Sequence, residues 1–121
     1  MARIVVIDDS RMMRTVLRRI LEKAGHQVTE WEPMSAAEIM EHVTAENPDL
    51  LITDYQMPGA NGATVVKMAR KAKPGIKIIA ITALRDEEVV ALLGRVEADA
   101  VLTKPAHEES LIDAVKTILE R

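Results

Sequence analysis

The sequence contains no cysteine and no phenylalanine, and its only aromatic residues are one tryptophan and one tyrosine. The absence of cysteine excludes disulfides, thiol catalysis and cysteine-based zinc sites. With so few aromatic residues the core must be aliphatic, and almost no aromatic side chain is available to stack on nucleic-acid bases. Basic residues number 16 against 19 acidic ones, so the net charge of −3 lacks the basic footprint of a DNA-binding domain. We therefore expect no nucleic-acid partner.

Long hydrophobic runs are missing as well. Only a short apolar run precedes Asp8, which is too short for a signal peptide or a membrane span. We therefore expect a cytoplasmic protein with no membrane partner. A length of 121 residues, with 48% hydrophobic and 29% charged residues, is typical of one globular domain. No linker or internal repeat is visible, so residues 1–121 are expected to form a single domain without an output domain.

Short apolar runs alternate with longer amphipathic segments along the chain. The runs expected to form strands are residues 3–7, 26–31, 50–53, 76–82 and 98–103, of which the first and third are expected to be buried. The segments expected to form helices are residues 11–24, 33–46, 63–73, 86–96 and 107–120. Pro33 suits the first turn of the second helix, and Gly25 and Pro48 mark helix ends. This alternation predicts an α/β fold, a doubly wound five-stranded parallel sheet with helices on both faces.

Three carboxylates, a hydroxyl and an ammonium, some with an adjacent small or proline residue, stand at the ends of four of the five predicted strands, where ligands bind in open parallel sheets. In chain order they are Asp8, Asp9, Asp54, Thr82, Ala83, Lys104 and Pro105. Taken singly, a strand-end aspartate is more often a helix cap or turn former, and a lysine is usually a solvated charge. Their conjunction at one sheet edge is harder to explain in that way, and it predicts a site.

The carboxylates of such a site would repel one another. Two carboxylates about 4 Å apart repel by on the order of 4 kcal/mol at an effective dielectric near 20. A hard divalent cation relieves this repulsion, and carboxylate and carbonyl oxygens are ligands that suit Mg²⁺. The sequence therefore predicts a magnesium site.

Four motifs together carry a family resemblance. They are IVVIDDS at residues 4–10, DYQMP at residues 54–58 followed by Gly62, the pair Thr82-Ala83, and the pair Lys104-Pro105. In their order, spacing and strand-end placement, the chain resembles a response regulator receiver domain of the single-domain chemotaxis-regulator (CheY-like) type, over essentially its whole length. The resemblance implies a (βα)5 flavodoxin-like fold with strand order 2-1-3-4-5.

The resemblance also implies a role for each matching residue. Asp54 would be the phosphoacceptor, taking a phosphoryl group from a phosphohistidine on a histidine kinase or a phosphotransfer protein. The implied magnesium ligands are the side chains of Asp8, Asp9 and Asp54 and the backbone carbonyl of Gln56. Lys104, the Thr82 hydroxyl and the Ala83 amide would bind the phosphoryl group. The Lys104–Pro105 peptide bond is expected to be cis.

The resemblance implies a phosphoacceptor switch and not an enzyme with a separate substrate. Such a switch would catalyse only its own phosphorylation and dephosphorylation, and acyl-phosphate hydrolysis would reset it. The switched face is expected to be the fourth helix, fifth strand and fifth helix, which would bind a downstream protein. Gln56 and Leu84 are expected to influence the lifetime of the phosphoryl group.

Three further positions carry expectations. Val101 stands where receivers usually have an aromatic residue, so we expect the usual inward aromatic flip to be missing. Trp31 is expected to be a half-buried anchor at the edge of the sheet. The arginines of the first helix are expected to form a solvated face, with a phosphodonor docking surface as the alternative; they are Arg11, Arg14, Arg18 and Arg19.

Other readings of the sequence are weaker. A haloacid-dehalogenase-type phosphatase also uses a strand-one aspartate, but it needs a second aspartate two residues later, where Ser10 stands, and 121 residues leave no room for its cap domain. A degenerate receiver that only binds partners is disfavoured because every functional position is filled. A Walker-type site is excluded because no GxxxxGK[ST] motif occurs. A receiver excised from a longer regulator fits the sequence equally well.

Overall fold

The computed structural model describes residues 1–57, 60–83, 87–104 and 107–121. Its main sheet has five parallel strands in the order β2-β1-β3-β6-β7. These strands are β1 (Arg3–Ile7), β2 (Gln27–Trp31), β3 (Leu50–Asp54), β6 (Lys77–Thr82) and β7 (Ala100–Thr103). Counted without the small ribbon β4–β5, this is the expected order 2-1-3-4-5, so the predicted fold is confirmed.

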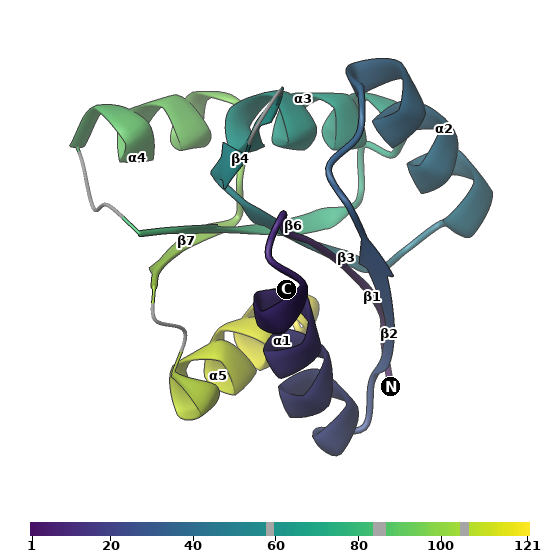
Figure 1. The fold of residues 1–121 in the computed structure, drawn as a ribbon, viewed down its shortest axis with the longest axis vertical. Coiled ribbons are helices and arrows are strands. Elements are labelled where there is room, and N and C mark those ends of the chain that lie inside the picture. The colour runs from purple at the N-terminus through teal and green to yellow at the C-terminus, as the bar shows by residue number, and fades with distance from the viewer. Residues whose placement is uncertain (58–59, 84–86, 105–106) are drawn as a thin grey trace.

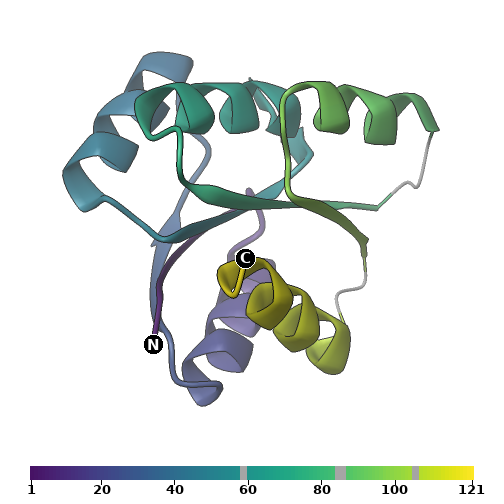
Figure 2. The ribbon, with the colours of Figure 1, turned by 180° about the vertical axis from the view of Figure 1, so that it is seen from behind.

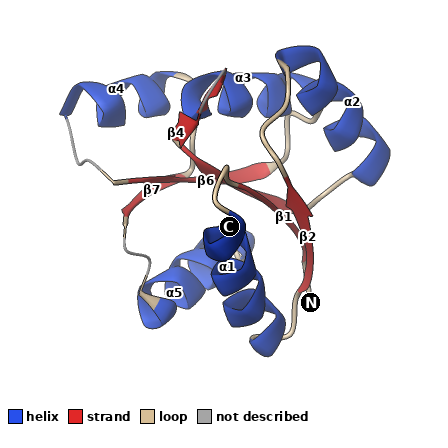
Figure 3. Cartoon of the chain, in the orientation of Figure 1, coloured by secondary structure: helices blue, strands red, loops and turns tan. Residues whose placement is uncertain are grey.

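Five helices cover the sheet in two layers. They are α1 (Arg11–Lys23), α2 (Ala36–Glu46), α3 (Gly62–Ala72), α4 (Glu87–Arg95) and α5 (Glu108–Leu119). Figure 1 shows α2, α3 and α4 over one face of the sheet and α1 and α5 over the other. The view from behind in Figure 2 shows the same two layers, and Figure 3 distinguishes the central strands from the surrounding helices. No helix within the described part of the chain is both long and apolar enough to cross a membrane.

The three central strands, β1, β3 and β6, are nearly continuous apolar runs because both faces of the sheet are covered there. In β1, Val5 and Ile7 belong to one core cluster and Ile4 and Val6 to the other, as the period of two requires. The buried hydrophobic residues are aliphatic with the exception of Trp31, which is only 6% exposed.

Trp31 lies on the edge strand β2, as expected, but the expectation that it is half-buried was wrong. Its indole Nε1–H donates to Glu46 Oε2 over 3.1 Å. Its ring packs edge-on against the His42 ring, with the two ring centroids 5.3 Å apart. The hydrogen bond satisfies the one polar atom of the indole, so the whole side chain can be buried beneath α2.

The start of α2 also differs from the prediction. The helix does not begin at Pro33 but at Ala36, because Ser35 caps it. The Glu38 N–H donates to Ser35 Oγ over 3.2 Å and the Ser35 N–H donates to Glu38 Oε1 over 3.3 Å, which is a capping box. At the end of α1 the prediction was correct, since Gly25 follows the helix with a φ of 97°.

A two-stranded antiparallel ribbon lies between β3 and α3, where the sequence predicted only a loop. It consists of β4 (Gln56–Met57) and β5 (Ala60–Asn61). Strands of two residues are too short to produce a recognisable alternation, so turn-forming residues dominate the sequence signal there. Asn61 then caps α3, its Oδ1 accepting the Thr64 N–H over 2.9 Å.

Candidate functional site

Three carboxylates predicted to meet do so. Asp8 and Asp9 follow β1, and Asp54 is the last residue of β3, the neighbouring strand. One carboxylate oxygen from each of the three lies within 4.8 Å of the others. Asp8 and Asp54 are 1% and 5% exposed, whereas Asp9 is exposed to solvent. The fold therefore holds two buried acids and one exposed acid in a single cluster at the carboxyl edge of the sheet.

Lys104 joins this cluster from the far side of β6. Its Nζ lies 3.2 Å from Asp54 Oδ2 and 3.3 Å from Asp8 Oδ2. The Lys104 backbone N–H donates to the Thr82 carbonyl over 2.8 Å, and this hydrogen bond fixes the Lys104 backbone beside the end of β6. Thr82 itself is fully buried between the strands that carry Asp54 and Lys104.

Burial and charge shift two pKa values in this cluster. Burial raises the pKa of the Asp8 carboxyl, the charge of Asp54 raises it further, and the Ser10 N–H and Lys104 only partly oppose this. For Lys104, partial burial acts to lower the pKa, but the carboxylates of Asp54 and Asp8 outweigh it and raise the pKa above its usual value. The ammonium is thus held charged, while the acids remain under mutual repulsion.

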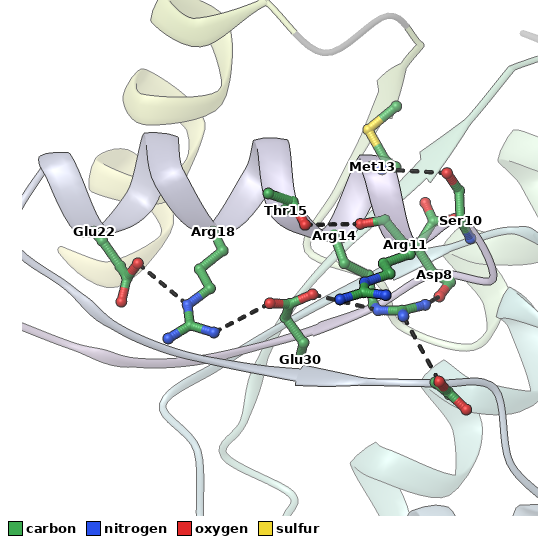
Figure 4. Close-up of polar contacts among 10 residues, drawn as sticks. Asp8, Ser10, Arg11, Met13, Arg14, Thr15, Arg18, Glu22 and Glu30 are labelled. Carbon is green, nitrogen blue, oxygen red and sulfur yellow. Dashed lines mark hydrogen bonds and ion pairs between the residues drawn. The ribbon is translucent and has the colours of Figure 1, made fainter.

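All the polar side-chain and carbonyl atoms of Asp8 are engaged. The Ser10 N–H donates to its Oδ1 over 2.8 Å, Lys104 contacts its Oδ2, and Arg14 Nη1 donates to its backbone carbonyl over 2.6 Å. Figure 4 shows the guanidinium of Arg14 between Asp8 and Glu30. The orientation of Asp8 is therefore fixed before any ligand binds.

Arg14 corrects one prediction. The arginines of α1 were expected to form a solvated face, but Arg14 is only 7% exposed. A signal for this was present in the sequence, since Arg14 shares the buried stripe of α1 with Leu17 and Leu21 at spacings of three and four residues. The acids that accept it, Glu30 and Glu32, could not be assigned to it without the fold.

Gly62 brings the start of α3 against the backbone of the phosphoacceptor candidate. A Cβ on Gly62 would lie 2.7 Å from the Asp54 carbonyl oxygen and 2.7 Å from the Tyr55 Cα. The Gly62 N–H donates to the Tyr55 carbonyl over 2.7 Å, and the Tyr55 N–H donates to the Ile81 carbonyl over 2.8 Å. The backbone after Asp54 is therefore held on both sides, and only glycine fits at position 62 without a shift.

Several predicted site features stay predictions. Gln56 lies in β4 with its side chain exposed, and Ala83 directly follows β6, but the roles of the Gln56 carbonyl and the Ala83 amide are untested. Leu84 and Pro105 lie outside the described residues, and so does the expected cis bond. Val101 lies in β7 opposite Ala80 and packs against the core cluster beneath α2, α3 and α4.

The donor atoms fit the cation that the sequence predicted. Carboxylate oxygens are hard ligands, and three of them in one cluster suit Mg²⁺ better than any metal that prefers sulfur or imidazole. Lys104 supplies a positive charge to the same cluster through its contacts with Asp8 and Asp54, whereas Asp9 is exposed. Such an arrangement can neutralise a bound anion from two sides.

Comparison with known proteins agrees with this geometry. The sequence matches the family described as the response regulator receiver domain over residues 4–116. The chain belongs to this family. The receiver is 28% identical over 116 residues to the chemotaxis protein CheY of Thermotoga maritima, covering 96% of both proteins. It is 33% identical to the protein PilH of Pseudomonas aeruginosa, covering 98% of both. A crystal structure of a CheY-like receiver from Methanospirillum hungatei JF-1 has a TM-score of 0.88 and 27% identity, covering 98% of this chain and 93% of that one.

Family membership establishes the general class of function. This is a receiver domain of two-component signalling systems, of the CheY-like type. Receiver domains are phosphoacceptor switches that use Mg²⁺ and interact with histidine kinases or phosphotransfer proteins and with downstream targets. The membership decides against the haloacid-dehalogenase-type phosphatase considered from the sequence.

Proposed function

We propose that Asp54 of this receiver accepts a phosphoryl group from the phosphohistidine of a histidine kinase or a phosphotransfer protein. The observation that carries the proposal is the contact of 3.2 Å between Asp54 Oδ2 and Lys104 Nζ, beside the carboxylates of Asp8 and Asp9. A carboxylate flanked by an ammonium and by a cation site is what phosphoryl transfer needs, because catalysis there is mostly positioning and charge neutralisation.

In the transfer step a carboxylate oxygen of Asp54 attacks phosphorus. The bond between phosphorus and the donor's imidazole nitrogen breaks, its electron pair returns to the ring, and an acyl phosphate forms on Asp54. Asp8, Asp9, Asp54 and the Gln56 carbonyl would hold Mg²⁺, which supplies neutralisation of phosphoryl charge. Lys104 pairs with a phosphoryl oxygen, and Thr82 and Ala83 donate hydrogen bonds.

Hydrolysis resets the switch. A water oxygen bonds to phosphorus, the bond between phosphorus and Asp54 breaks, and inorganic phosphate leaves with regeneration of the carboxylate. The lifetime between these steps is expected to depend on Gln56 and Leu84.

The phosphoryl group adds roughly −1.5 to −2 charges if it behaves as other protein phosphates do. Lys104 and Thr82 respond to it, and both stand at the carboxyl ends of β7 and β6, next to the segments that lead to α5 and α4. The α4–β7–α5 face therefore changes on phosphorylation and binds a downstream protein. Val101 cannot perform the aromatic flip usual in receivers, so movement of Thr82 and Lys104 toward the phosphoryl group transmits the change.

Incubation with Mg²⁺ and acetyl phosphate tests this proposal by intact-protein mass spectrometry. We expect one phosphoryl group per chain, lost on removal of Mg²⁺ and absent in Asp54→Asn. Asp113→Asn, which removes an exposed carboxylate on α5, is the control and should be labelled like wild type. Lys104→Ala should still be labelled but should fail to bind the downstream partner. Label retained in Asp54→Asn, or sustained turnover of a phosphomonoester, would contradict the proposal.

A further inference from the structure

The backbone carbonyl of Asp8 lies beyond the end of the sheet pairing, so among the described residues no neighbouring strand donates a hydrogen bond to it within the ladder. The registers of β1 with β2 and with β3 both end at Ile7, so Asp8 lies one residue beyond either ladder. Asp8 is nevertheless 1% exposed, and a buried carbonyl requires a donor. Arg14 supplies it, because its Nη1 donates to the Asp8 carbonyl over 2.6 Å.

The guanidinium that makes this bond is itself held from the other side. Arg14 Nε lies 3.4 Å from Glu30 Oε1, and Arg14 Nη2 lies 3.8 Å from Glu32 Oε1. Glu30 and Glu32 flank Trp31 at the end of β2, so by the alternation of a strand they face α1 while Trp31 faces α2. Figure 4 shows this chain of contacts running from Glu30 through Arg14 to Asp8.

The bond to the Asp8 carbonyl also determines where Asp9 lies. A peptide unit is planar, so fixing the direction of the Asp8 carbonyl fixes the plane that contains the Asp9 nitrogen and Cα. The carboxylate of Asp8 is already held by the Ser10 N–H and by Lys104. Asp9 is the exposed member of the carboxylate cluster, and Arg14 is the side chain that holds the peptide leading to it.

A positive charge so close to a cation site would by itself weaken cation binding. Here the charge of Arg14 faces the carboxylates of Glu30 and Glu32, which offset it. The two possible roles of Arg14 therefore predict opposite results for its removal. If Arg14 positions the ligands, its removal weakens cation binding; if Arg14 acts mainly through its charge, its removal strengthens cation binding.

We propose that Arg14 is a positioning residue for the cation site, which presets the Asp8–Asp9 turn by holding the Asp8 carbonyl. The inference rests on the proposed function, because it assumes that these acids bind Mg²⁺. Arg14 touches neither the cation nor the phosphoryl group. Residues that orient metal ligands typically contribute a factor of about 10 to 100 in metal affinity, and Arg14 acts on one backbone carbonyl, so we expect about tenfold.

The test measures cation affinity directly. Mn²⁺, a hard cation with the same preference for oxygen, is titrated with detection by electron paramagnetic resonance, and Mg²⁺ is measured by competition. Arg14→Met removes the donor and the charge, whereas Arg14→Lys keeps the charge but loses the planar fork that serves carbonyl and carboxylates together. Arg18→Met is the matched control, because Arg18 lies 3.2 Å from Glu30 but makes no contact with Asp8 among the described residues.

We expect both Arg14 variants to bind Mn²⁺ and Mg²⁺ about tenfold more weakly than wild type, with Arg18→Met unchanged. In the nuclear magnetic resonance spectrum of metal-free Arg14→Met, the amide resonance of Asp9 should be shifted or broadened relative to wild type. Phosphorylation by acetyl phosphate should recover toward the wild-type rate at saturating Mg²⁺, because Arg14 touches no reacting atom.

Other outcomes overturn the inference. Unchanged affinity with a lowered melting temperature would assign Arg14 a purely structural role. Tighter binding by Arg14→Met, with Arg14→Lys like wild type, would assign it a role through charge. If Arg14→Met does not fold, Arg14→Lys alone decides between weakened and unchanged affinity. Failure of wild type to bind either cation would contradict the proposed function itself, and the inference with it.

Discussion

Lys104 Nζ lies 3.2 Å from Asp54 Oδ2, although the two residues belong to chain segments separated by the whole of β6. The lysine reaches across the end of this strand, where Thr82 is buried. A hydroxyl, an ammonium and a carboxylate are thereby gathered from three adjacent strand ends. In the proposed function, a phosphoryl group on Asp54 would meet Lys104 at this contact, so the proposed chemistry and the proposed response involve the same pair of residues.

The acidic cluster should cost the metal-free protein stability. Its carboxylate oxygens lie within 4.8 Å of one another, and two charges at that upper limit repel by roughly 3 kcal/mol at an effective dielectric near 20, of which Lys104 offsets part. We therefore expect Asp8→Asn to raise the free energy of unfolding by about 1 kcal/mol without Mg²⁺. Urea denaturation measures this.

The same substitution should remove the stabilisation that Mg²⁺ gives to wild type, since binding to the folded state stabilises it. Denaturation with and without Mg²⁺ provides the control within one experiment. A metal-free Asp8→Asn protein less stable than wild type would contradict the account of repulsion in the cluster.

Gly62 should be intolerant of even one extra carbon. In Gly62→Ala the Cβ would meet the Asp54 carbonyl oxygen and the Tyr55 Cα at 2.7 Å, so the backbone must shift and carry the Asp54 carboxylate with it. We expect a loss of about 1–3 kcal/mol in stability, as for overpacking elsewhere, and slower labelling by acetyl phosphate.

Gly94 supplies the matched control. It lies within α4, and a Cβ there would meet nothing within 4 Å. Gly94→Ala should therefore stabilise the protein by roughly 0.5–1 kcal/mol, because alanine loses less backbone entropy in a helix. Equal effects of the two substitutions would show that crowding at Gly62 is not what constrains that position.

Arg70 should be a major contributor to stability away from the site. Its guanidinium donates to the Glu97 carbonyl over 2.6 Å, to Asp99 Oδ2 over 3.0 Å and to the Ile76 carbonyl, and so ties α3 to the start of β6 and to the segment before β7. We expect Arg70→Met to lower the free energy of unfolding by about 2–3 kcal/mol. Lys71→Met, at the adjacent exposed position, should have little effect in the same denaturation experiment.

His26 should make stability depend on pH. Partial burial, and then the charge of the N-terminus, lower the pKa of His26, whose Nδ1 accepts the Ala2 N–H over 3.1 Å. Because the folded pKa lies below the unfolded value of about 6.5, the unfolded state takes up the proton first as the pH falls. Stability should therefore decline from about pH 7 downward, and level off below the folded pKa.

Denaturation curves between about pH 7.5 and 5.5 measure this slope, which His26→Gln should reduce. His107→Gln is the control, since His107 is exposed and its side chain makes no capping bond to α5. A slope that is the same in wild type and His26→Gln would contradict the assignment.

The sheet and the acidic cluster could be predicted because both rest on strong local signals. Each buried strand is a short apolar run, and the carboxyl ends of parallel strands must meet at one edge, so Asp8, Asp9 and Asp54 could be brought together from the sequence. The contact of Lys104 with Asp54 follows from the same rule, although its distance does not.

The features that escaped prediction have different causes, which are local for the start of α2 and distant for the burial of Trp31. The start of α2 was placed at Pro33 because proline favours a first turn, while the reciprocal bonds of Ser35 and Glu38 decided the boundary. Burial of Trp31 depends on Glu46, fifteen residues later, which supplies its acceptor. Arg14 was assigned to the surface by its charge, although its place on the apolar stripe of α1 indicated burial.

The most direct test of the account is to locate the phosphoryl group. The receiver is incubated with Mg²⁺ and acetyl phosphate, the acyl phosphate is reduced with borohydride to homoserine, and the modified position is identified by peptide mass spectrometry. The account predicts homoserine at position 54 alone, and none when Mg²⁺ is removed. Homoserine at position 8 or 9, or the same yield without Mg²⁺, would contradict it.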